Sequence, residues 1–132
     1  MSRIPDINFI ALIGKTLTVV NGAVADSDVV TFATEDGLSY RLYHDQDCCE
    51  SVDLEEVVGD LNDLIGSPIL QAEEVSGELE PPKDEGYGPP ESYTWTFYKL
   101  ATIKGSVTLR WYGTSNGYYS ESVTVAGVKD GD

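Results

Sequence analysis

The sequence predicts an α+β domain in which a mostly antiparallel sheet of six or seven strands packs one face against a single amphipathic helix. Several segments alternate apolar and polar side chains with a period of two and are separated by turns rich in Gly, Asn and Asp, a pattern typical of antiparallel strands. One segment, residues 53–65, instead repeats its apolar side chains at helical spacing. A chain of 132 residues is in the size range of one domain, so we expect residues 1–132 to fold as a single unit.

The N-terminal part is predicted to hold a short helix and three strands. The helix is expected to begin at Pro5 or Asp6 and to end at Gly14, because Pro and Asp favour helix starts and Gly favours helix ends. The period of two then predicts strands at residues 17–20, 29–32 and 39–44.

The main helix is predicted over residues 53–65. Its apolar members follow the i, i+3, i+4, i+7 spacing of one buried face: Leu54, Val57, Val58, Leu61, Leu64 and Ile65. Asp53 and Glu56 form a capping-box pattern at its start, and Gly66 provides a stop. We therefore expect this helix to cover one face of the sheet.

The C-terminal half is predicted to be a strand, a long loop and a meander. A strand is expected from residue 68 to about residue 75. Residues 76–91 are rich in Pro, Gly and acidic side chains, so they predict an exposed acidic loop. The remaining strands are expected at residues 92–103, 106–113 and 118–125, with 126–132 as a tail.

The formal net charge of −15 is concentrated in one part of the chain. Fifteen acidic residues and a single basic one, Lys83, lie between Asp45 and Glu91. Such a field repels nucleic acid and anionic lipid and attracts basic protein surfaces or cations. We therefore expect a basic protein partner, no direct nucleic-acid binding and no membrane association.

The two cysteines and the N-terminus predict a cytoplasmic protein. Cys48 and Cys49 are adjacent, and neighbouring residues do not readily form an unstrained disulfide, so reduced thiols are expected. The first six residues lack the basic start and small-residue cleavage site of a signal peptide.

The segment from residue 44 to residue 50 concentrates reactive side chains. One interpretation is a divalent-metal site, with ligands drawn from His44, Asp45, Asp47, Cys48, Cys49 and Glu50. A second is a hydrolase in which His44 activates a thiol. A third is a loop in which Asp45 and Asp47 accept hydrogen bonds from turn amides above buried thiols. The third needs no cofactor, and it is the interpretation that the spacing favours.

The predicted meander has one apolar face and one polar-aromatic face. One face of the strand predicted at residues 106–113 carries Val107, Leu109 and Trp111. The other face carries Thr108, Arg110 and Tyr112. Glu121 shares a face with apolar side chains in the last predicted strand, so it is expected either to lie in water at a strand end or to pair with Arg110 or Lys99.

Several segments together resemble a small family of uncharacterised proteins encoded mainly by bacteriophages and prophages. They are His44-Asp45-Gln46-Asp47-Cys48-Cys49-Glu50 with its continuation to residue 52, residues 59–66, residues 92–99, and residues 110–113 with 116–121. The resemblance covers about residues 15–125. It implies no known reaction, but it implies a phage setting, in which small accessory proteins often block a host component, and hence the cytoplasm of a bacterial host.

Three function classes follow. The first is a non-enzymatic inhibitor of a host factor, such as a restriction or CRISPR defence complex, acting through acidic side chains on the helix and the following strand: Asp53, Glu56, Asp60, Asp63, Glu73 and Glu74. High net charge that serves only solubility also explains this acidic row.

The second class is a module that sequesters a signalling nucleotide or a divalent ion. It would use residues 44–50 and the reverse face of the sheet: Arg41, Arg110, Tyr112, Tyr118 and Glu121. The third is the thiol enzyme. Tyrosines on the reverse face, Tyr93, Tyr98, Tyr112 and Tyr118, also suggest a homodimer through the sheet.

Overall fold

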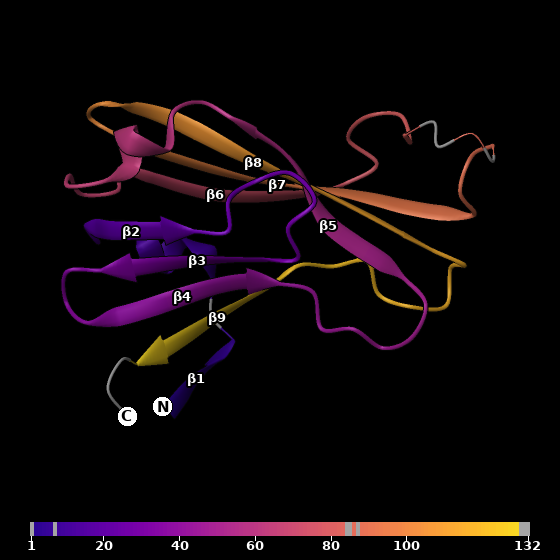
Figure 1. Ribbon diagram of the computed structural model, residues 1–132, viewed down its shortest axis with the longest axis horizontal. Coiled ribbons are helices and arrows are strands. Elements are labelled where there is room, and N and C mark those ends of the chain that lie inside the picture. Colours follow the sequence, from indigo (N-terminus) through magenta and orange to yellow (C-terminus); the bar gives the residue numbers. More distant parts are fainter. Residues whose placement is uncertain (1, 7, 84–85, 87, 130–132) are drawn as a thin grey trace.

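The computed structural model describes residues 2–6, 8–83, 86 and 88–129 and shows a sandwich of two antiparallel sheets (Figure 1). The five-stranded sheet has the order β1-β9-β4-β3-β2, and the four-stranded sheet has the order β5-β8-β7-β6. The strands are β1 (Ser2–Asp6), β2 (Leu17–Asn21), β3 (Val29–Thr34), β4 (Leu38–Tyr43), β5 (Ser51–Val58), β6 (Gln71–Gly77), β7 (Ser92–Thr102), β8 (Gly105–Ser115) and β9 (Thr124–Lys129). Two 3-10 turns, η1 (Phe9–Leu12) and η2 (Leu61–Leu64), are the helical elements of the described residues.

The predicted α+β class is therefore wrong, because the segment expected to be the main helix forms β5 and η2. β5 pairs with β8, and its register shifts between Leu54 and Glu56. Because of this bulge, the alternation of inward and outward side chains shifts by one residue. After Leu54, the next side chain of β5 that faces the core is therefore Val57, three residues later and not two. A bulged strand followed by a 3-10 turn thus imitates the spacing of a helix face.

The predicted N-terminal helix is also wrong. Its first residues form β1, which pairs with β9, and only the single turn η1 follows. Asn8 caps that turn by accepting a hydrogen bond from the Ile10 amide at 3.1 Å. Phe9 and Leu12 are buried, whereas Ile10 and Ile13 are exposed. The four residues of η1 therefore bury Phe9 and Leu12 in the core, which the longer predicted helix was expected to do.

The last strand was assigned to the wrong residues and the wrong sheet. Residues 116–123 form an irregular connection, and β9 begins at Thr124. β9 lies between β1 and β4 in the five-stranded sheet, so the part of the predicted tail up to residue 129 is strand. Residues 130–132 lie outside the described residues. The other predicted strands are confirmed within a few residues of their expected bounds.

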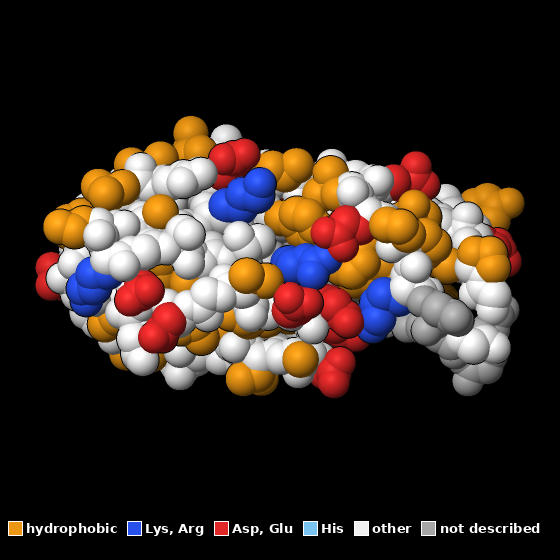
Figure 2. Space-filling view, turned by 90° about the horizontal axis from the view of Figure 1, so that it is seen from above, with side chains coloured by type: hydrophobic (Ala, Val, Ile, Leu, Met, Phe, Trp, Pro, Cys, Tyr) orange, Lys and Arg blue, Asp and Glu red, His pale blue; other side chains and the backbone are white. Residues whose placement is uncertain are grey.

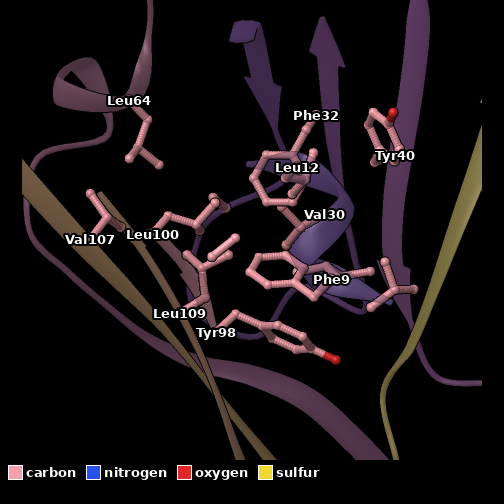
Figure 3. Packing of buried hydrophobic residues seen from close by; sticks show 14 of the residues in the cluster. Phe9, Leu12, Val30, Phe32, Tyr40, Leu64, Tyr98, Leu100, Val107 and Leu109 are labelled. Carbon is pink, nitrogen blue, oxygen red and sulfur yellow. The ribbon is translucent and has the colours of Figure 1, made fainter. Parts of the chain in front are cut away.

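The core fills the space between the two sheets (Figure 3). Val30, Phe32 and Leu42 face it from the five-stranded sheet. From β8, Val107, Leu109 and Trp111 face it as predicted from their alternation. Phe9 packs on Tyr98 with ring centroids 4.6 Å apart, so η1 closes one side of the sandwich. None of the described helices is long and apolar enough to cross a membrane.

Candidate functional site

Glu50 organises the loop between β4 and β5. Its side chain is buried, and its two oxygens accept hydrogen bonds from the amides of Asp47 at 2.9 Å and Cys48 at 2.8 Å. Gln46 spans the loop by donating to the carbonyls of Cys48 and Glu50. The prediction that Asp45 and Asp47 would accept the turn hydrogen bonds is wrong, because the buried carboxylate of Glu50 accepts the bonds from the turn amides.

His44 joins this loop to the connection before β9. Its Nε2 lies 2.7 Å from Glu50 Oε2, and its Nδ1 lies 2.7 Å from the Ser122 carbonyl oxygen. A carbonyl oxygen and a carboxylate both accept hydrogen bonds, so the His44 ring lies between two acceptors. Burial favours the protonated form of Glu50, but the Asp47 amide, His44 and the Cys48 amide outweigh it and lower the pKa of this carboxyl to about 2.

The cysteines do not behave as predicted. A disulfide joins Cys48 to Cys49, and both residues are exposed, whereas the sequence predicted reduced, buried thiols. In this state neither sulfur is a free nucleophile for the thiol mechanism. Within the described ranges, no group of three or more His, Cys, Asp or Glu side chains is placed to hold a metal ion.

The acidic row expected on a helix is dispersed. Glu56 pairs with Arg110 Nη1 at 3.0 Å, and Asp60 caps η2 by accepting from the Asn62 amide at 2.9 Å. Asp63 lies within η2. On β6, Glu73 and Glu74 sit opposite Lys99 and Tyr98 of β7. These carboxylates point in different directions, so they cannot form the predicted line.

Asp53 belongs instead to an acidic surface beside the loop of residues 44–50. Burial, followed by the charges of Asp28 and Asp26, raises the pKa of the Asp53 carboxyl. Asp28 and Asp53 line one depression of about 310 Å³ with His44, Gln46, Glu50 and neighbouring residues. Hydrogen bonds join the 22–28 turn to β5 at Leu54, which places these carboxylates together. We call Asp26, Asp28, Asp45, Asp47 and Asp53 the acidic rim.

The outer face of the four-stranded sheet carries an aromatic cluster around Arg110. The guanidinium lies 5.1 Å from the Trp95 ring centroid and 5.2 Å from that of Phe97, and it pairs with Glu56 and Glu80. Figure 2 looks down on this side of the molecule and shows basic side chains beside acidic and apolar ones. The cation is therefore neutralised within the chain.

Residues 80–83 of the predicted exposed loop lie across this cluster. The Pro81 carbonyl accepts from Trp95 Nε1 at 3.2 Å, and the Lys83 amide donates to the Tyr112 hydroxyl at 3.1 Å. Lys83 Nζ also pairs with Glu55 at 2.6 Å. Part of this loop is thus a strap rather than a free segment, and it covers Tyr112, one of the tyrosines on which a homodimer was predicted. Another of them, Tyr98, lies in the core and not on the reverse face.

The residues predicted to bind a nucleotide are not brought together. Arg41 lies between the buried Tyr40 and Leu42, and Arg110 lies between the buried Leu109 and Trp111, so each arginine points away from the core on its own sheet. They therefore lie on opposite outer faces. Tyr118 is 88% exposed on the connection before β9. The structure forms no shared basic pocket from these residues.

Glu121 lies in a polar cavity at one end of the sandwich. It is 8% exposed, and it accepts hydrogen bonds from the hydroxyls of Thr94 at 2.7 Å and Ser115 at 2.5 Å. Neither predicted environment is correct, because the carboxylate is neither in water nor paired with Arg110 or Lys99. The cavity, of about 210 Å³, is lined by Glu74, Ser76, Thr94, Thr96, Ser120, Glu121, Ser122 and Val123.

One feature of the sequence of β7 indicates this cavity. Thr94 and Thr96 share a face of β7 with the buried Tyr98 and Leu100, so the inner face changes from apolar to hydroxyl-bearing along one strand. Alternation alone favours the opposite assignment for this part of β7, with its aromatic residues inward. A run of two threonines on a core face would have indicated a polar interior.

A family model covers these sites. The model for Domain of unknown function (DUF7448) matches residues 10–125. The chain belongs to this family. The match includes the loop of residues 44–50, the strap and the Glu121 cavity, so all three lie within the part of the chain that defines DUF7448. No curated protein and no solved structure shows significant similarity to the chain.

Proposed function

We propose that this DUF7448 domain is a non-enzymatic accessory protein of phage type that binds and inhibits a host protein through the acidic rim. The proposed target is a defence nuclease or its complex, of the restriction or CRISPR kind, because such proteins carry basic grooves for nucleic acid. The resemblance to phage and prophage proteins supports the setting, and the charge of −15 supports a basic partner.

The observation that carries this proposal is the gathering of carboxylates beside a rigid loop. Asp26 and Asp28 lie close enough to Asp53 to contribute to its raised pKa. Asp47 is held in place because its amide binds the buried Glu50. Carboxylates that are held in place before binding lose little conformational entropy when they bind a basic surface. The positive charge of that surface also reduces the repulsion among them.

The test is phage plating on bacteria that carry a restriction or CRISPR system and express the domain. We expect the wild-type domain to restore plating and the triple variant Asp26→Asn, Asp28→Asn, Asp47→Asn to fail. With the purified target, association should slow by about tenfold or more in the triple variant and should also slow with rising salt.

The matched control is Glu35→Gln, Glu73→Gln, Glu78→Gln, which removes three exposed charges away from the acidic rim. It changes net charge equally, so it should retain inhibition. Equal loss in both triple variants would mean that net charge alone acts, and full activity of the acidic-rim variant would refute the proposed surface.

A further inference from the structure

We infer that the Glu121 cavity binds a primary ammonium group, and that in the complex with a basic partner this group is a lysine side chain. The partner half of this inference rests on the proposed function. The cavity opens between β6, β7 and residues 120–123, and Ser122 also holds His44 through its carbonyl. The cavity therefore lies next to the loop that carries part of the acidic rim.

The charge of Glu121 has no cationic partner among the described residues. Glu121 is buried, yet the groups that bind it are two neutral hydroxyls. Within residues 8–83 and 88–127, no Lys, Arg or His side chain pairs with it, in contrast to Glu50, which has His44. A buried carboxylate without a cation is costly, and a cationic ligand would offset this cost.

The lining of the cavity has hydrogen-bond acceptors to spare. Each oxygen of Glu121 accepts one hydroxyl and keeps a further lone pair. Thr96 is 3% exposed and lines the cavity, and its hydroxyl makes no hydrogen bond to any other described residue. Glu74, which is exposed and also interacts with the Tyr98 hydroxyl, adds a second carboxylate at the cavity. An ammonium group has three donors and no acceptor, so acceptors from Glu121, Thr96 and Glu74 match it in number.

The lining also fits an ammonium group better than other cations. A guanidinium carries five N–H donors in a rigid planar fork, and three acceptor side chains, Glu121, Thr96 and Glu74, match it less well than they match the three donors of an ammonium group. Calcium prefers six to eight oxygen ligands, with several carboxylates among them, and in the described part of the chain only Glu74 and Glu121 line this cavity with carboxylates. Val123 offers an apolar contact for a methylene stem. The cavity therefore fits a lysine side chain better than an arginine or a metal ion.

The experiment is an NMR titration of the isolated, isotope-labelled domain. The probes are n-butylammonium chloride, acetyl-Gly-Lys-Gly-amide and acetyl-Gly-Arg-Gly-amide, with 1-butanol and calcium chloride as comparisons. We expect saturable shifts of the Thr94, Thr96 and Ser122 amides with the first two probes. Affinity should fall about tenfold in Glu121→Gln, because the ligand loses its charge partner, and should be unchanged in Glu35→Gln.

A second variant keeps the inference testable if Glu121→Gln does not fold. Thr96→Val keeps the shape and β-branching of the side chain and removes only the hydroxyl; we expect it to fold and to bind several-fold more weakly. Equal shifts with 1-butanol, tighter binding of calcium or the arginine peptide, or unchanged affinity in Thr96→Val would overturn the inference. If n-butylammonium binds but acetyl-Gly-Lys-Gly-amide does not, the inference that a lysine of the partner occupies the cavity is overturned. The titration contains no partner protein, so its result is independent of the plating test.

Discussion

At the scale of single residues, two buried carboxylates illustrate two ways to stabilise a charge. Glu50 is held by backbone amides and by His44, which lower the pKa of its carboxyl to about 2. Glu121 is held by hydroxyls alone among the residues that the structure describes. The first arrangement is complete within the chain and stabilises a loop, whereas the second keeps unused acceptors facing a cavity. We therefore assign Glu50 a structural role, whereas the unused acceptors of Glu121 are the basis of the proposed ammonium site.

Glu50 should make stability depend on acidity. Its folded-state pKa of about 2 is below the ordinary value of 4.5, so the ionised carboxylate stabilises the folded protein. This contribution is complete above about pH 4.5 and is lost as the pH falls toward 2. Denaturant unfolding at a series of pH values should show this loss in the wild type. Glu50→Gln should be less stable at neutral pH and should lack this part of the acid sensitivity; a wild-type pH profile in the variant would contradict this role.

At the scale of elements, the junction after β5 shows how backbone contacts end a strand. Gly59 has a φ of +111°, and a Cβ placed there would lie 2.5 Å from the Ser106 carbonyl oxygen of β8. Asp60 then caps η2. The glycine is required for two reasons, the left-handed backbone and the close approach of β8. The chain therefore leaves the sheet at a defined residue.

Gly59→Ala should destabilise more than a matched glycine substitution. Gly37 also has a positive φ, +82°, but nothing lies within 4 Å of its added Cβ. We expect Gly37→Ala to cost about 1 to 2 kcal/mol from backbone strain alone, and Gly59→Ala to cost about twice as much because β8 must move. Chemical denaturation of both variants measures the difference. Equal losses would show that the contact with β8 is relieved without cost.

At the scale of the whole molecule, the C-terminal strand closes the sandwich. β9 pairs with β1 on one side and β4 on the other, so the five-stranded sheet is continuous only when the end of the chain has been added. Val125 lies opposite Leu42 and faces the core, while Thr124 lies opposite Tyr43. Strands far apart in the sequence thus share one sheet.

A chain that ends at Val123 should fail to fold. It would leave β1 and β4 without their common neighbour and would expose the core beside Leu42. Far-ultraviolet circular dichroism and an amide NMR spectrum of the truncated chain test this. The control Thr124→Ala should change the free energy of unfolding by no more than about 0.5 kcal/mol. A dispersed native-like spectrum from the truncated chain would show that β9 is dispensable.

The local sequence pattern by itself determined several strands of this protein and which of their side chains face the core. Turn residues and alternation located β3, β4, β7 and β8, and they assigned Leu109 to the core face. These features depend on neighbours along the chain, which sequence displays directly. The concentration of charge was equally visible.

Only the tertiary structure decided the rest. Pairing with β8 made residues 51–58 a bulged strand, because hydrogen bonds to a distant segment outweighed the helical spacing. The sites also depend on the tertiary structure. Glu50 and His44 are close in the sequence, but Glu121 accepts a hydrogen bond from Thr94, 27 positions away. Asp53 is influenced by the charge of Asp28, from which β3 and β4 separate it in the sequence. Burial and hydrogen-bond partners depend on which segments lie side by side, and a one-dimensional pattern does not contain that information.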